Sequence, residues 1–126
     1  MVLVDTSVWV RFLSNRAPYA AGLDRLLADG DVIGHEFVFG ELLIGDRGGR
    51  HTLLADYGLM VEAPVVPHRE VVRFIRERKL HGGGIGWVDA HLLASALISH
   101  ARLWTADARL ADVATQLGVG YSGEDA

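Results

Sequence analysis

Residues 2–7 have the sequence VLVDTS, in which three apolar residues, two of them β-branched, precede an aspartate. This composition predicts a short buried strand that ends directly before Asp5. Thr6 or Ser7 can cap a helix that begins near Val8, so Asp5 is predicted to lie where a strand ends and a helix starts. In an open α/β sheet, ligands bind at this edge. We therefore expect the Asp5 carboxylate either to pair with a positive group or to hold a metal ion.

The length of 126 residues predicts a single domain over residues 1–126, and a hydrophobic content of 50% argues against a disordered chain. No apolar run approaches the roughly 20 residues that span a bilayer. A signal peptide is not expected either, because the N-terminus has no basic leader. The absence of cysteine excludes disulfides and zinc–sulfur sites, which fits the cytoplasm. The net charge of −4 argues mildly against a nucleic-acid partner, although it does not describe any local face.

Strand and helix patterns alternate along the chain, which predicts a three-layer α/β/α domain with a mainly parallel central sheet of four or five strands. Strands are expected at residues 2–4, 32–34, 59–66 (broken at Pro64), 102–105 and, at an edge, 119–121. Helices are expected at residues 8–14, 19–28, 35–44, 52–57, 67–79, 90–98 and 108–117.

Four of the sixteen acidic residues lie in apolar surroundings, where an unpaired carboxylate is costly. Asp5 and Asp107 follow strands, Asp89 opens an apolar helix, and Glu41 lies in the middle of another helix. Each aspartate has an alternative role as a helix N-cap. The alternative for Glu41 is an ion pair with an arginine such as Arg47. A parallel sheet brings these elements to one edge, which favours a shared acid site.

Clustered carboxylates repel one another, and a divalent cation relieves that repulsion. A ligand set made only of oxygen favours Mg²⁺, or Mn²⁺ as a substitute, over zinc. Such an ion lowers the pKa of a bound water and neutralises a phosphodiester during its displacement. The acid pattern therefore predicts metal-dependent phosphoester chemistry.

Four segments carry a resemblance to a known family: VLVDTSVWV at 2–10, GELLIG at 40–45, GIGWVDAHLLASA at 84–96 and LWTADARLADVA at 103–114. Together they resemble the PIN-domain ribonucleases, specifically the VapC toxins of type II toxin–antitoxin pairs. The resemblance implies a PIN fold and a Mg²⁺-dependent endoribonuclease that cleaves RNA. It also implies a homodimer that a VapB-like antitoxin holds inactive.

The resemblance assigns roles to individual side chains. Metal-binding and catalytic roles are implied for the four acids, Asp5, Glu41, Asp89 and Asp107. Roles in orienting these carboxylates are implied for three hydroxyl residues, Thr6, Ser7 and Thr105. In addition, the glycine-containing loop at 45–50 carries Arg47 and Arg50, which we interpret as possible RNA contacts. The stripe formed by Arg69, Arg73 and Arg76 is more typical of a solvated helix face.

Three alternatives remain. A Mg²⁺-binding receiver-like regulatory domain needs an adjacent acid pair and a late lysine, but Val4 precedes Asp5 and the only lysine, Lys79, lies within a predicted helix. A haloacid-dehalogenase-type phosphatase needs Asp-x-Asp-x-Thr, and Ser7 stands where its second aspartate belongs. The closest rival is a PIN-domain nuclease that acts in RNA maturation rather than as a toxin.

Overall fold

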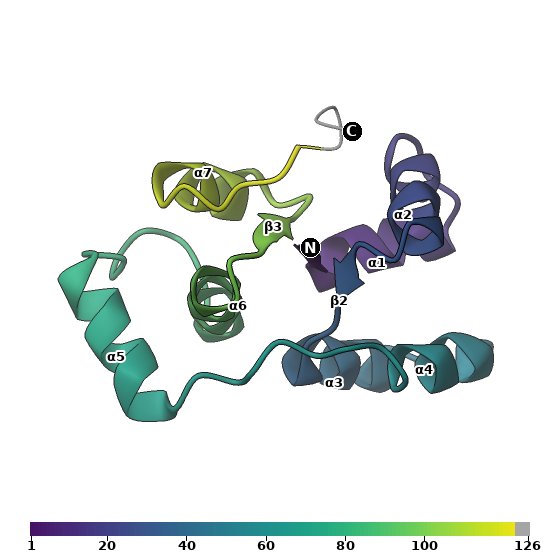
Figure 1. Cartoon of the computed structure of the whole chain (residues 1–126), viewed down its shortest axis with the longest axis horizontal. Helices are drawn as coiled ribbons and strands as arrows, with labels where there is room; N and C mark the ends of the chain where they lie inside the picture. Colours follow the sequence, from purple (N-terminus) through teal and green to yellow (C-terminus); the bar gives the residue numbers. More distant parts are fainter. Residues whose placement is uncertain (123–126) are drawn as a thin grey trace.

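The computed structural model describes residues 1–122, and its described part contains a parallel sheet with helices on both sides (Figure 1). The regular strands are β1 (Val2–Val4), β2 (Val32–Ile33) and β3 (Arg102–Trp104), in the order β2-β1-β3. Both pairings are parallel. The predicted mainly parallel sheet is thus confirmed, with the first strand of the chain at its centre.

The sheet continues beyond both edge strands by single bridges. Gly34 pairs with Glu62, and Leu103 pairs with Gly120, both in parallel orientation. The predicted strand over residues 59–66 is therefore wrong in its extent, and the predicted edge strand over 119–121 is likewise reduced to one bridge. Pairing with residues 61–63 ends after Gly34 because the chain enters a helix at Glu36.

Seven helices are described, and their limits differ from the predicted ones by up to three residues. They are α1 (Thr6–Leu13), α2 (Tyr19–Ala28), α3 (Glu36–Ile44), α4 (His51–Tyr57), α5 (His68–Glu77), α6 (Trp87–Ile98) and α7 (Ala108–Gln116). The largest difference is at α6, which begins three residues before the predicted start. Within residues 1–122, no helix has the length and apolar character that crossing a bilayer requires.

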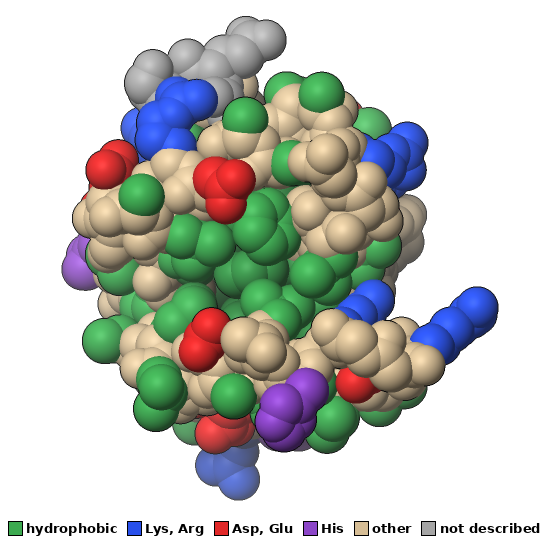
Figure 2. Space-filling model, turned by 90° about the vertical axis from the view of Figure 1, so that its right-hand side faces the viewer, with side chains coloured by type: hydrophobic (Ala, Val, Ile, Leu, Met, Phe, Trp, Pro, Cys, Tyr) green, Lys and Arg blue, Asp and Glu red, His purple; other side chains and the backbone are tan. Residues whose placement is uncertain are grey.

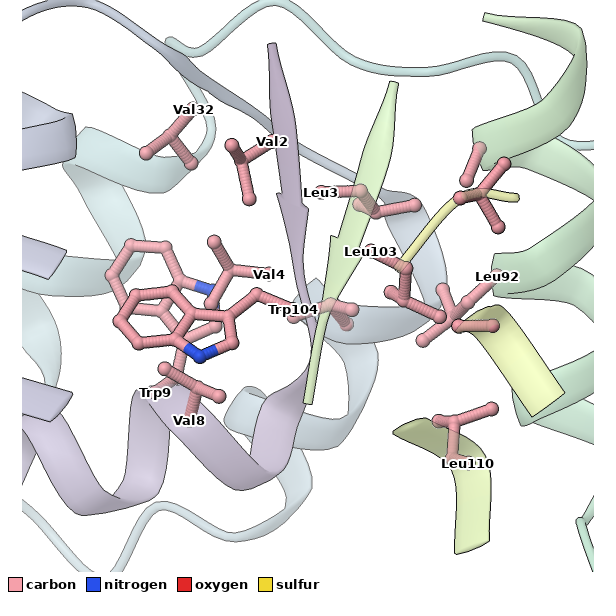
Figure 3. Close-up of a cluster of buried hydrophobic side chains, with 14 of the residues drawn as sticks. Val2, Leu3, Val4, Val8, Trp9, Val32, Leu92, Leu103, Trp104 and Leu110 are labelled. Carbon is pink, nitrogen blue, oxygen red and sulfur yellow. The ribbon is translucent and has the colours of Figure 1, made fainter. Parts of the chain in front are cut away.

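Successive side chains of β3 point to opposite faces of the sheet, and each face is covered (Figure 3). Leu103 packs with Leu92 of α6, and both are almost completely buried. Trp104 lies on the other face against α2, where a Cβ added at Gly22 would come within 2.9 Å of the indole. Helical layers on the two faces confirm the three-layer α/β/α arrangement.

The parallel direction of the strands places their carboxyl ends at one edge of the sheet. Asp5 follows β1, and Thr105 follows β3. The amide of Asp5 donates to the carbonyl of Trp104 at 2.8 Å, which holds these two strand ends together. This edge positions the candidate site.

Candidate functional site

Asp5 is buried at the end of β1, with 8% of its surface exposed. Its Oδ2 accepts hydrogen bonds from the hydroxyls of Ser7 at 2.6 Å and Thr105 at 2.8 Å. Although Asp5 occupies the N-cap position of α1, its side chain makes no capping bond. The N-cap interpretation is therefore wrong for this residue, and both hydroxyl bonds fall on one carboxylate oxygen.

The two hydroxyls that bind Asp5 are fixed by backbone amides. Ser7 Oγ accepts from the amide of Ala106 at 2.9 Å, and Thr105 Oγ1 accepts from the amide of Asp107 at 3.1 Å. Because each hydroxyl accepts a bond from the backbone and gives its proton to Asp5, its orientation is determined. The turn between β3 and α7 thus sets the direction of the Asp5 carboxylate.

Glu41 projects from the middle of α3 and is exposed. Its Oε1 accepts a hydrogen bond of 2.6 Å from the hydroxyl of Thr6, the first residue of α1. The side chain is thus bonded to Thr6 and not to Arg47, which was the alternative partner. Arg50 donates from Nη1 to the carbonyl of Leu42 at 2.8 Å, so it holds the loop 45–50 against the end of α3.

Asp89 lies in the first turn of α6 and is only partly exposed. Its Oδ2 accepts from the amide of Gly86 at 2.9 Å, which closes the start of the helix. Burial raises the pKa of Asp89, the Gly86 bond opposes this, and the carboxylates of Asp5 and Asp107 raise the pKa further. These repulsions show that three of the acids lie in one electrostatic neighbourhood.

Asp107 caps α7. Its Oδ1 accepts from the amides of Arg109 at 2.9 Å and Leu110 at 3.1 Å, so the N-cap interpretation is confirmed for this residue. The side chain of Arg109 turns away from the acid and donates from Nε to the carbonyl of Gly83. It thereby ties the start of α7 to the glycine-rich loop that leads into α6.

The donor set suits a hard divalent cation because it consists of carboxylates, and no guanidinium hydrogen bond to any of the four acids is found within residues 1–122. In the same part of the chain, however, no three acidic or histidine side chains stand close enough to hold an ion as they are. Each carboxylate is instead held by a hydroxyl or a backbone amide. The residues fit a metal in kind, and coordination requires the carboxylates to converge.

A buried polar network under α3 was not predicted from the sequence. His35 is fully buried, its Nδ1 accepts from the amide of Phe37 at 3.0 Å, and its Nε2 lies 3.0 Å from Ser95 Oγ. Since Ser95 donates its own proton to the carbonyl of Pro64 at 2.9 Å, Nε2 of His35 must be the protonated nitrogen. Burial, and secondarily the charge of His91, lowers the pKa of His35 to about 4. The neutral ring joins β2, α3, α6 and the extended segment 61–66.

Comparison with known proteins points to one family. The PIN-domain family model matches residues 2–116. The chain is 43% identical over 125 residues to proteins named Ribonuclease VapC32 from two strains of Mycobacterium tuberculosis, CDC 1551 and H37Rv, with 98% of each chain covered.

Proposed function

Because the chain belongs to the PIN-domain family, we propose that it is a metal-dependent endoribonuclease that acts as the toxin of a type II toxin–antitoxin pair. The carrying observation is the set of carboxylates at the carboxyl edge of the sheet, where hydroxyls or backbone amides, and no arginine, hold Asp5, Glu41, Asp89 and Asp107 within residues 1–122. Burial, and to a smaller extent the charges of Asp5 and Asp107, raises the pKa of Asp89. Such a set of carboxylates binds a cation in preference to any anionic substrate, so an ion must mediate contact with phosphate. Nucleases of this family generally use a divalent metal ion.

Mg²⁺ is the proposed ion, with Mn²⁺ as a substitute, because oxygen-only ligand sets suit these cations. Asp5 and Asp89 are the proposed principal ligands, and Glu41 and Asp107 complete the set. When bound, the ion supplies a water of lowered pKa and charge neutralisation at the phosphodiester. Ser7 and Thr105 keep Oδ2 of Asp5 occupied, so its other oxygen would be the one available to the ion.

Glu41 is the acid that α3 contributes to the proposed metal site. Its carboxylate is exposed, and the hydroxyl of Thr6 holds Oε1 at 2.6 Å. Thr6 neighbours Asp5 in the chain, so the start of α1 supports both carboxylates, each through a different hydroxyl. Arg47 is exposed in the loop after α3 and is proposed to contact the RNA backbone. The substrate would be single-stranded or loop RNA, because unstacked bases and their backbone are more accessible than those of a duplex.

Asp5→Asn tests this assignment. The amide oxygen of asparagine can still accept from Ser7 and Thr105, so the fold should persist while metal binding is lost. Cleavage of a structured RNA should be abolished in the variant and should require Mg²⁺ or Mn²⁺ in the wild type, with chelator as the blank. Asp24→Asn, at an exposed position of α2, is the matched control and should cleave normally. Wild-type cleavage by Asp5→Asn with the metal requirement intact would count against the assignment.

An antitoxin of the VapB type is the proposed regulatory partner in the cytoplasm. Figure 2 shows hydrophobic side chains gathered in a hollow on one face, with acidic side chains at its rim. An apolar and basic segment of a partner is complementary to such a surface. The product of a short reading frame upstream should bind the chain and stop RNA cleavage. Binding without inhibition would favour a role in RNA maturation.

A homodimer is also proposed. Ile44 at the end of α3 has 88% of its surface exposed, and Leu59 has 86%, so large apolar side chains remain uncovered in the single chain. Sedimentation of the purified protein measures its oligomeric state directly. A monomer at micromolar concentration would contradict the proposed homodimer without affecting the nuclease assignment.

A further inference from the structure

A ladder of rings crosses three helices on one side of the site. His68 of α5 lies 5.1 Å from Trp87 of α6, which lies 4.7 Å from His91 one turn further along the same helix. His91 lies 4.7 Å from Phe37 of α3, and Phe37 lies 5.2 Å from His35. The ladder is buried at the His35 end and reaches solvent at Trp87, which is 43% exposed. It therefore presents a supported ring at the surface.

The exposed end of this ladder is connected to the acid site through two helices. Trp87 is the first residue of α6, and Asp89 follows two residues later, on a different face of the same first turn. Phe37 and Glu41 are four residues apart on α3, so they share a helix face. Each of these two helices therefore carries one acid of the site and one aromatic ring of the ladder. Asp89 and Glu41 therefore each lie within about one helical turn of a ring of the ladder.

Trp87 differs from the other two tryptophans of the chain. Trp9 is 1% exposed and Trp104 is 4% exposed, and both belong to the core. Trp87 is held edge-to-face by His91, at an interplanar angle of 82°, so the indole is restrained although much of it meets solvent.

We propose that Trp87 forms a base-stacking subsite for single-stranded RNA next to the acid site, an inference that rests on the proposed ribonuclease function. Every base offers a face for stacking on an aromatic ring, so the subsite accepts RNA without a strict sequence requirement. Helix α5, which supplies His68, also carries Arg69, Arg73 and Arg76, all of them exposed. These arginines provide positive charge for the phosphates of the strand that leaves the stacked base.

Binding is measured first without cleavage, in the Asp5→Asn background. A short single-stranded RNA with Mg²⁺ is added while tryptophan fluorescence is recorded. Because Trp87 is the exposed indole, stacking should quench its emission, and Trp87→Phe should remove the quench while preserving affinity. Trp87→Ala should weaken binding about 5- to 100-fold, from the loss of one stacked base. Ile98→Ala, at the far end of α6 and 56% exposed, is the matched control and should bind normally.

Cleavage is then measured with Asp5 intact. Trp87→Ala should raise KM by a similar factor and leave kcat nearly unchanged, because the indole binds the substrate and does not touch the reacting atoms. Trp87→Phe should restore KM. A duplex of the same sequence should show no dependence on Trp87, because its bases are already stacked on one another. Thermal unfolding of each variant verifies that the fold is retained.

Different results would refute the stacking subsite and the nuclease assignment. If the wild type cleaves RNA but Trp87→Ala binds and cleaves with unchanged affinity and KM, the stacking subsite is refuted and the nuclease assignment stands. If Trp87→Ala converts a dimer to a monomer and leaves RNA affinity intact, the ring belongs to a protein interface and the inference is overturned. Absence of any metal-dependent RNA cleavage by the wild type refutes the nuclease assignment itself.

Discussion

Buried His35 should make the stability of this protein depend on pH between about 6.5 and 4. The neutral ring accepts a bond from the amide of Phe37 at Nδ1, and protonation of that nitrogen would break the bond inside the core. Burial of the ring, and secondarily the charge of His91, holds the pKa of His35 near 4 in the folded state, against 6.5 for an ordinary histidine. Between these two values the unfolded chain binds a proton that the folded chain does not, so acid favours unfolding.

The sign and the size of the change in unfolding free energy follow from this difference in proton binding. The stability contributed by the neutral ring is fully present above pH 6.5, declines as the pH falls, and is fully lost below pH 4. The pKa values of 6.5 and about 4 correspond to about 3 kcal/mol in total, at about 1.4 kcal/mol per tenfold change in proton affinity. About 2.5 kcal/mol of this should be lost by pH 4.5. That is a large fraction of the roughly 5–15 kcal/mol that stabilises a typical domain.

His35→Gln isolates this contribution, because a glutamine amide can accept from Phe37 and donate to Ser95 but does not titrate. Urea unfolding of both proteins, followed by circular dichroism, gives the free energy of unfolding at pH 7.5 and 4.5. The wild type should lose about 2.5 kcal/mol more than the variant over this interval. The carboxyls and His91, whose pKa burial also lowers, are present in both proteins and cancel in the difference. Equal losses in the two proteins would refute the role assigned to His35.

Two further substitutions test the packing around the site. Ser7→Ala removes a donor from Asp5 and should weaken Mn²⁺ binding about 10- to 100-fold in calorimetry, whereas exposed Ser14→Ala should not; equal affinities would contradict the orienting role. Gly22→Ala should lower the free energy of unfolding by about 1–3 kcal/mol, because its Cβ would stand 2.9 Å from Trp104. Gly40→Ala meets no atom within 4 Å and should stabilise α3 slightly, and similar melting curves for both glycine variants would disprove the overpacking argument.

The sequence was sufficient to predict a mainly parallel sheet because apolar strand segments alternate with helical patterns. Asp5 and Asp107 border strands, so their place at one edge of the sheet follows from topology alone. The extent of the strand predicted at residues 59–66 could not be predicted, because Leu59 and Val61 have the composition of a buried strand. In the fold they are 86% and 71% exposed, beside a single bridge.

The partners of the acids were only partly predictable. Thr6 and Ser7 were both expected to orient carboxylates, but their division between Glu41 and Asp5 depends on how α1 packs against α3. That packing involves residues 35 apart in the chain, and no local pattern encodes it. The hydrogen-bond network around His35 could not be predicted from the sequence either, because a single histidine before a helix forms no periodic pattern. Only its burial and its three-dimensional partners reveal the role.

Electrostatic repulsion explains why the four carboxylates stay apart without a cation. Gathered without a cation, four negative groups in a partly buried space would raise one another's pKa, as Asp5 and Asp107 already do for Asp89. Their present partners avoid this by holding each group apart: hydroxyls at Asp5 and Glu41, backbone amides at Asp89 and Asp107. A divalent ion reverses the sign of the interaction among the acids and makes convergence favourable. The same charge reversal lets a protein of net charge −4 hold a phosphate group against the acids at this edge.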